Sequence, residues 1–295
     1  MPRRPLRGEP VEEASVNPAV SRAPEAGGPA SGQTEQARRD PASVLAASTF
    51  SAGLRLLPRS LQADARSLYY LLRTLDDLVD EEDPRASDRV EAVESWARGE
   101  DALDTAEVRT LIDLSQRYPL PRQAFADFCK GMRADLTGEV MKTEADLERY
   151  CEYVAGTVAI MLAGLLGTIH PDGVSKMAVL GRAMQRTNIL RDIDEDLARG
   201  RVYIAASAIE RFGFPYPGQR EELLRDQIAR ADALFAEGLT AIPLLREGRR
   251  AMGISGVLYR EILRQIERDG FGRRAGRAKV PNWRKQHLIA RYPVH

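Results

Sequence analysis

Two stretches of the sequence place oxygen-bearing side chains at intervals of four residues. In the first, Asp76 precedes Asp80, and in the second Asn188, Asp192 and Asp196 follow one another. On a helix, residues four apart share one face at a spacing of about 6 Å, where like charges repel each other. Carboxylate and amide oxygens are the ligands that Mg²⁺ or Mn²⁺ prefers, with water and phosphate oxygens completing the shell. Both stretches therefore predict acidic helix faces that bind metal ions.

A single acidic face of this kind is usually solvated surface rather than a metal site. Two such faces in one chain favour metal binding, because together they could hold several cations around a diphosphate. A diphosphate is a poor leaving group until cations neutralise its charge. Basic side chains near the second stripe could contact phosphate oxygens, namely Arg191, Arg199 and Arg201. Apolar walls beside such a site would shelter an allylic cation from water. The predicted chemistry is metal-assisted ionisation of an allylic diphosphate.

Beyond its first forty residues the chain is helical in pattern almost throughout. Apolar residues recur at intervals of three and four, as at Leu68, Leu71 and Leu72. No segment alternates between polar and apolar residues next to hairpin turns, and the composition does not change between residues 41 and 270. The sequence predicts a single all-α domain over residues 41–295, in which two acidic helices face each other.

Residues 156–167 form an apolar segment that is rich in glycine. Glycine in a helix interior costs about 1 kcal/mol relative to alanine, so its presence needs a reason. From the residues alone, close helix packing is the favoured explanation, and room for an elongated apolar ligand is the alternative. The longest uncharged apolar run, residues 154–169, is shorter than the ~20 residues that span a bilayer. We expect a buried helix there.

The overall charge and the two cysteines exclude several classes of function. Lys and Arg total 43 and Asp and Glu total 43, so the chain lacks the basic excess that bulk nucleic-acid binding needs. Cys129 and Cys151 are too few for a disulfide framework and lack metal-ligand spacing with the histidines, which predicts reduced thiols in a cytoplasmic protein. No sequence feature sets an oligomeric state.

The two ends of the chain differ in charge and composition. Residues 1–40 show no apolar periodicity and no apolar core of a secretory signal, and we expect a disordered tail. Residues 271–295 are basic and carry one tryptophan. This segment is either a solvated tail or a peripheral contact with anionic lipid, at about 1 kcal/mol per basic residue near the membrane. Alternatively, Arg277 or Lys279 could fold over the diphosphate site.

The motifs around both acidic stripes resemble those of the phytoene/squalene synthase family. Within this family, the bacterial carotenoid enzymes resemble this sequence most. The second stripe is the most specific, because its Asn-x-x-x-Asp-x-x-x-Asp core is followed by Arg-Gly-Arg-Val-Tyr. The resemblance extends over about residues 45–285 and is carried by residues 49–58, 73–80, 150–158, 188–203 and 259–263.

This resemblance implies an isoprenoid-synthase helical bundle with a central apolar cavity. The implied metal ligands are Asp76, Asp77, Asp80, Asn188, Asp192 and Asp196, with Asp77 in a supporting role. The implied diphosphate contacts are Arg73, Gln185, Arg191 and Arg201. The implied tunnel-lining residues are Phe50, Tyr69, Val154, Val158 and Leu162. Tyr150 and Tyr259 would face the reacting carbons, with Tyr150 handling a proton or stabilising the cation. Under this interpretation the tunnel, rather than close packing, explains residues 156–167.

The implied reaction joins two isoprenyl diphosphates head to head through a cyclopropylcarbinyl diphosphate, with Mg²⁺ as cofactor. Two C20 substrates would give phytoene by loss of a proton, which is the preferred interpretation. Two C15 substrates would give presqualene diphosphate, or squalene with hydride from NADPH. The sequence contains no Gly-x-Gly-x-x-Gly nucleotide loop, although relatives that use NADPH need not carry one. A terpene cyclase on the same fold is a further alternative, and the intact acidic stripes disfavour a non-catalytic relative.

One position departs from the family pattern. Family members often carry a basic residue or histidine just before the Ser/Thr-Phe pair, where this chain has Ala46 and Ala47. One diphosphate contact is therefore missing or supplied elsewhere. Substrate chain length depends on side-chain packing at a few bends of the tunnel, which sequence patterns do not encode.

Overall fold

The computed structural model describes residues 53–293, and every regular element in that range is a helix apart from one isolated bridge between Thr168 and Leu245. The predicted all-α class is confirmed. The helices are α4 (Arg59–Asp80), α5 (Ala86–Arg98), α6 (Ala106–Ser115), α7 (Arg122–Thr137), α8 (Glu144–Cys151), the π-helix η1 (Glu152–Gly156), α9 (Thr157–Leu166), α10 (Asp172–Ala198), α11 (Ala206–Phe212), α12 (Glu221–Gly238), the 3₁₀-helix η2 (Leu239–Leu244), α13 (Arg249–Arg268) and α14 (Asn282–Arg291). The predicted tail at residues 1–40 and the predicted tunnel residue Phe50 lie outside the described residues.

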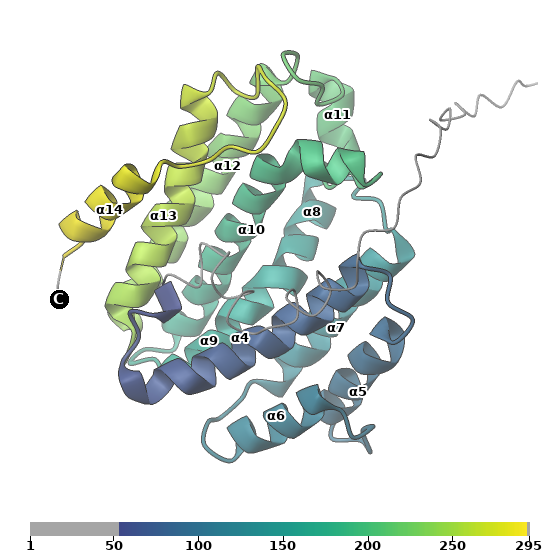
Figure 1. Cartoon of the computed structure of the whole chain (residues 1–295), viewed down its shortest axis with the longest axis vertical. Coiled ribbons are helices and arrows are strands. Elements are labelled where there is room, and N and C mark those ends of the chain that lie inside the picture. The colour runs from purple at the N-terminus through teal and green to yellow at the C-terminus, as the bar shows by residue number, and fades with distance from the viewer. Residues whose placement is uncertain (1–52, 294–295) are drawn as a thin grey trace, which may run out of the picture. The chain divides into compact units, whose positions relative to one another are not determined.

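Helix α10 runs through the middle of the bundle and carries the second acidic stripe (Figure 1). It contacts α12, α9, α13, η1 and η2. The consecutive residues Met177, Ala178, Val179, Leu180 and Gly181 are all buried, so this part of the helix has no solvent-facing side. A helix that is apolar on every side belongs in the core. The acidic stripe therefore sits on the C-terminal half of a helix whose first half is fixed by packing.

Helix α4 carries the first acidic stripe. Its apolar residues at intervals of three and four, including Leu68, Leu71 and Leu75, are buried as the sequence pattern predicts. They pack α4 against α5, α6, α7 and α9, and Figure 1 shows the helix crossing in front of α9 and α7. The packed apolar side fixes the rotation of α4 about its axis. Asp76 and Asp80 are thereby held in place beside the core.

The run Glu144–Leu166 joins α8, η1 and α9 into one continuous helical segment. Gly181 of α10 allows η1 to come close, because a Cβ atom there would lie 2.3 Å from the carbonyl oxygen of Ala155. Gly164 likewise faces Pro121, whose Cδ atom would lie 3.2 Å from a Cβ atom on that glycine. By length and composition this segment could cross a membrane, but 50% of the relevant window is buried inside the protein. Its contacts with α10 and α7 identify it as a core helix.

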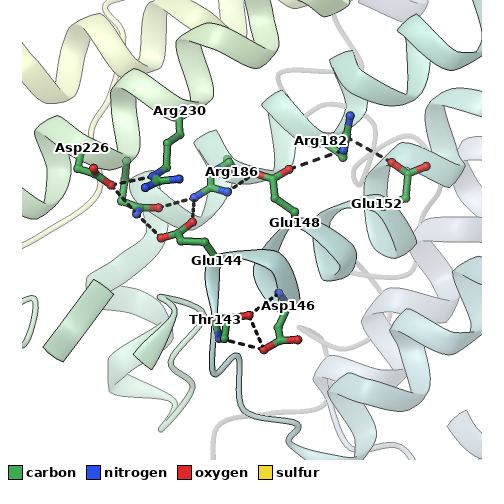
Figure 2. A network of polar contacts seen from close by, with 10 residues as sticks. Thr143, Glu144, Asp146, Glu148, Glu152, Arg182, Arg186, Asp226 and Arg230 are labelled. Atoms are coloured by element: carbon green, nitrogen blue, oxygen red, sulfur yellow. Dashed lines mark hydrogen bonds and ion pairs between the residues drawn. The ribbon is translucent and has the colours of Figure 1, made fainter. Parts of the chain in front are cut away.

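A buried polar network fastens α10 to α8 and α12 (Figure 2). Arg186 of α10 is 1% exposed and donates hydrogen bonds to Glu144 at 2.5 Å and to Gln227 at 2.6 Å. It also forms an ion pair with Glu148. Figure 2 shows Glu144 and Glu148 of α8 on two sides of Arg186. Because α8 and α10 both supply residues to the cavity described below, this network sets the relative position of two of its walls.

Candidate active site

A cavity of about 410 Å³ is lined by acidic, basic, aromatic and apolar side chains from α4, α7, α8, α9, α10 and α13. Along α10 the lining changes from Met177 and Leu180 to Asn188, Asp192 and Asp196, so the cavity has an apolar part and an acidic end. The predicted site residues in the lining are Tyr69, Arg73, Asp76, Asp80, Tyr150, Val154, Val158, Leu162, Gln185, Asn188, Arg191, Asp192, Asp196, Arg201 and Tyr259. Of the predicted residues that the structure describes, it brings together all but Asp77.

The two acidic stripes meet at the polar end of the cavity. Arg201, just after α10, forms an ion pair with Asp80 of α4. Burial raises the pKa of Asp76 to about 7, although Arg73 opposes the shift and 37% of the Asp76 side chain is exposed. Burial, followed by the charge of Asp192, raises the pKa of Asp196 to about 7 as well. These carboxylates lie close to one another and are partly removed from water, and both effects disfavour their negative charge. A bound divalent cation would offset this electrostatic cost.

The oxygen atoms at this end fit a magnesium ion. Asn188 Oδ1 is buried and accepts no hydrogen bond from residues 53–293, while Asn188 Nδ2 donates to Gln185 Oε1 at 3.2 Å. A buried acceptor without a partner costs about 1–3 kcal/mol, which a ligand can offset. Within residues 53–293, no three acidic, histidine or cysteine side chains converge closely enough to hold an ion by themselves. Mg²⁺ takes few protein ligands and completes its shell with water and phosphate oxygens.

The arginines predicted to contact diphosphate are held against the acidic stripes. Arg73 pairs with Asp76 at 2.7 Å and with Asp77 at 2.6 Å. Arg191 donates to Asp192 at 2.7 Å. Asp77 does not line the cavity, and its observed contact is with Arg73 rather than with the other carboxylates. A bound diphosphate would compete with the carboxylates for these guanidinium groups.

Tyr150 belongs to a hydrogen-bonded group that the sequence patterns did not reveal. Its hydroxyl donates to Asp135 of α7 at 3.1 Å, and that of Tyr203 donates to the same carboxylate at 3.0 Å. The two tyrosine rings stack, with their centroids 5.2 Å apart. Burial raises the pKa of Asp135 to about 6 and raises the pKa of Tyr150 well above its usual value. Tyr150 therefore keeps its proton at neutral pH.

The apolar part of the cavity combines predicted and unpredicted residues. Val158 and Leu162 of α9 line it as the family resemblance implies, whereas Gly164 of the same helix packs against Pro121. Thus Val158 and Leu162 in the glycine-rich segment border the cavity, whereas Gly164 allows close packing. Lining residues that were not predicted include Leu72, Phe128, Met177, Leu180, Met184 and Met252. Burial raises the pKa of Tyr259 to about 12, so this tyrosine also stays neutral.

The segment after α13 reaches the cavity through Arg277. This side chain contacts Asp192 at 2.9 Å and Glu195 at 3.6 Å, whereas Lys279 does not line the cavity. Of the two basic residues considered for this position, the geometry favours Arg277. Helix α14 contacts α13 and has no buried residue, and its Trp283 is 63% exposed.

Comparisons with known proteins agree with this geometry. The sequence profile of the squalene/phytoene synthase family matches residues 45–284. A phytoene synthase of Thermus thermophilus is 34% identical over 265 residues, which is 83% of this chain and 90% of the relative. A 15-cis-phytoene synthase of Synechococcus elongatus is 33% identical over 266 residues, which is 81% of this chain and 86% of the relative.

Solved structures show the same arrangement of helices. A dehydrosqualene synthase crystallised with a ligand superposes with a TM-score of 0.75 and 28% identity, covering 87% of this chain and 96% of the other. The squalene synthase HpnC of Alicyclobacillus acidocaldarius superposes with a TM-score of 0.66 and 27% identity, covering 76% of this chain and 89% of the other. The cavity between α4 and α10 thus belongs to a helical framework that these proteins share.

Proposed function

We propose that this chain, which belongs to the squalene/phytoene synthase family, joins two molecules of geranylgeranyl diphosphate head to head to form phytoene. Family membership makes the protein a prenyltransferase of the phytoene/squalene synthase type. The main structural support for this reaction is the cavity, which is lined by two acidic stripes and several arginines at one end and by apolar side chains elsewhere. The C20 substrate is supported by the relatives named phytoene synthase, which are 34% and 33% identical.

The polar end of the cavity would hold the diphosphate. Bound to Asp76, Asp80, Asn188, Asp192 and Asp196, Mg²⁺ would neutralise the diphosphate and make it a better leaving group. The side chains of Arg73, Arg191 and Arg201 would orient phosphate oxygens, since a guanidinium group donates two parallel hydrogen bonds to such an anion. The prenyl chain would then lie along the apolar side of α9 and the first half of α10.

The apolar walls would protect the carbocation from water, and the tyrosines would stabilise its charge. When the C–O bond breaks, the electron pair leaves with the diphosphate, and the apolar walls exclude water that would capture the cation. Tyr150 is suited to stabilise the cation rather than to accept a proton, because it stays protonated and donates to Asp135. Its aromatic ring, stacked on Tyr203, offers a π face to positive charge.

The second ionisation completes the product. Attack by the double bond of the second substrate gives the cyclopropylcarbinyl diphosphate, whose own diphosphate then leaves. Rearrangement and loss of one proton yield phytoene without a hydride donor, so we propose that NADPH is not used. Farnesyl diphosphate is the alternative substrate, because two solved structures of similar fold, 28% and 27% identical, are named for squalene-type products.

The stoichiometry of diphosphate release tests this reaction. With the full chain, Mg²⁺ and geranylgeranyl diphosphate, we expect two diphosphates per hydrocarbon molecule, because both substrates ionise. An enzymatic assay of diphosphate alongside chromatography of the hydrocarbons gives this ratio. One diphosphate for every two substrates consumed would mean that the reaction stops at the cyclopropyl stage. One diphosphate and one cyclic product per substrate would show a cyclase and refute head-to-head condensation.

A further inference from the structure

A second cavity, of about 460 Å³, lies next to the diphosphate end of the first. It is formed by the segment between α13 and α14 together with parts of α10, α12 and α13. Arg191 and Arg277 line both cavities, so the two spaces share a basic wall. No step of the proposed reaction needs this space.

The lining of the second cavity is rich in arginine. Its six guanidinium groups belong to Arg191, Arg220, Arg268, Arg273, Arg274 and Arg277. Among the described residues, only two acidic side chains lie in the lining, those of Asp194 and Asp269. Four of the arginines pair with carboxylates: Arg191 and Arg277 with Asp192, Arg220 with Asp194, and Arg268 with Glu261. The side chains of Arg273 and Arg274 form no ion pair with any residue from 53 to 293.

The segment that carries these two arginines is fastened to the bundle on both sides of them. Before them, Gly272 passes over the buried guanidinium of Arg220, so closely that a Cβ atom would lie 2.2 Å from Arg220 Nε. After them, the amide of Gly276 donates to Asp194 at 2.7 Å. The Arg220 side chain is 3% exposed and pairs with Asp194 at 2.7 Å, while its Nε has no hydrogen-bond partner in the part of the chain that the structure describes.

This fastening has a consequence for binding. Only three residues separate Gly272 from Gly276, so the backbone of Arg273 and Arg274 is held in place before any ligand arrives. A pre-ordered site loses less conformational entropy when it binds. Arg273 and Arg274 are exposed and both line the cavity. Guanidinium groups without carboxylate partners favour an anion with several oxygens, which each can contact through two hydrogen bonds. The chemistry of the cavity is therefore that of a phosphate-bearing anion.

We infer that the second cavity binds inorganic diphosphate, the anion released at the neighbouring site. The inference rests on the proposed function, in which every product molecule is accompanied by two diphosphates that must leave. The acidic end of the first cavity repels such an anion unless metal ions are bound, whereas the second cavity offers mainly guanidinium groups. Arg191 and Arg277, which both pair with Asp192, line the two cavities and so connect them.

Binding of diphosphate in EDTA tests the inference, because chelation removes the metal-dependent site from the measurement. Titrating sodium diphosphate into the full chain in a calorimeter should reveal one site. In the double variant Arg273→Gln/Arg274→Gln the affinity should fall at least tenfold. The matched control is Lys285→Gln/Arg291→Gln, which removes the same charge from α14 outside the cavity. Its affinity should stay within twofold of the wild type.

Three results would overturn the inference. The first is unchanged affinity in the cavity variant, and the second is an equal loss in the control, which would indicate diffuse attraction to a basic segment. The third is equal affinity for orthophosphate, since diphosphate should profit from reaching both Arg273 and Arg274. If the double variant does not fold, the single variant Arg274→Gln carries the same comparison. The assay needs no turnover, so its outcome is separate from whether phytoene is formed.

Discussion

Replacing Asp192 with asparagine, or Asp76 with asparagine, should lower kcat about 10³-fold or more while the protein stays folded. Each change removes one of the carboxylates that we propose as metal ligands at the acidic end of the cavity. Metal neutralisation of a leaving group is worth several kcal/mol, and a loss of about 4 kcal/mol corresponds to a factor of about 10³ in rate. The check is the rate of diphosphate release at saturating substrate over a range of Mg²⁺ concentrations.

Thermal stability separates this effect from misfolding. The raised pKa of Asp76 means that its ionised form disfavours the folded state, so this carboxylate lowers stability increasingly as pH rises from 3.8 to about 7. At pH 8 without metal, Asp76→Asn should therefore melt no lower than the wild type. The control Asp104→Asn changes a carboxylate that is 77% exposed and far in sequence from both stripes, and it should keep full activity. Full activity of Asp76→Asn with unchanged Mg²⁺ dependence would contradict the two-stripe assignment.

Replacing Arg186 with leucine should lower the free energy of unfolding by about 3 kcal/mol, because removing one partner of a buried ionic network leaves the others uncompensated. Arg186 is 1% exposed and bonds Glu144, Glu148 and Gln227 across two neighbouring helices. A loss of this size corresponds to a drop in Tm of about 6–12 °C. Calorimetric or circular-dichroism melting of the full chain measures it.

The neighbouring Arg182 provides the matched control for this prediction. It lies one turn earlier on α10, is 27% exposed and makes longer contacts, 3.3 Å to Glu152 and 3.8 Å to Glu148. Arg182→Leu should cost less than about 1 kcal/mol, as is usual for partly exposed ion pairs. An equal effect of both substitutions would show that the network in Figure 2 does not depend on the buried guanidinium.

Local sequence patterns predicted the helices well because their information is periodic. The intervals of three and four that place Leu68 and Leu75 in the core of α4 also place Asp76 and Asp80 together beside it. The same reasoning put Asn188, Asp192 and Asp196 on one stripe of α10. The family resemblance then supplied what periodicity cannot, namely that residues from α4, α8 and α10 border one cavity.

Contacts between distant segments were beyond the sequence patterns. Asp135 carries no repeat or motif, and only the fold reveals that it accepts hydrogen bonds from Tyr150 and Tyr203. Tyr203 could have been found, since it ends the Arg-Gly-Arg-Val-Tyr run. Met177 and Met252 were recognisable as apolar core residues, but which core side chains border an empty space depends on packing in three dimensions.

The measurement that tests the central claim most directly is product analysis. The purified full chain is incubated with Mg²⁺ and either geranylgeranyl or farnesyl diphosphate, with and without NADPH, and the extracted hydrocarbons are identified. We predict a C40 product from geranylgeranyl diphosphate that forms without NADPH. A C30 product or presqualene diphosphate formed in preference would contradict phytoene synthesis and move the protein to the squalene branch, and a cyclised C20 product would contradict head-to-head condensation itself.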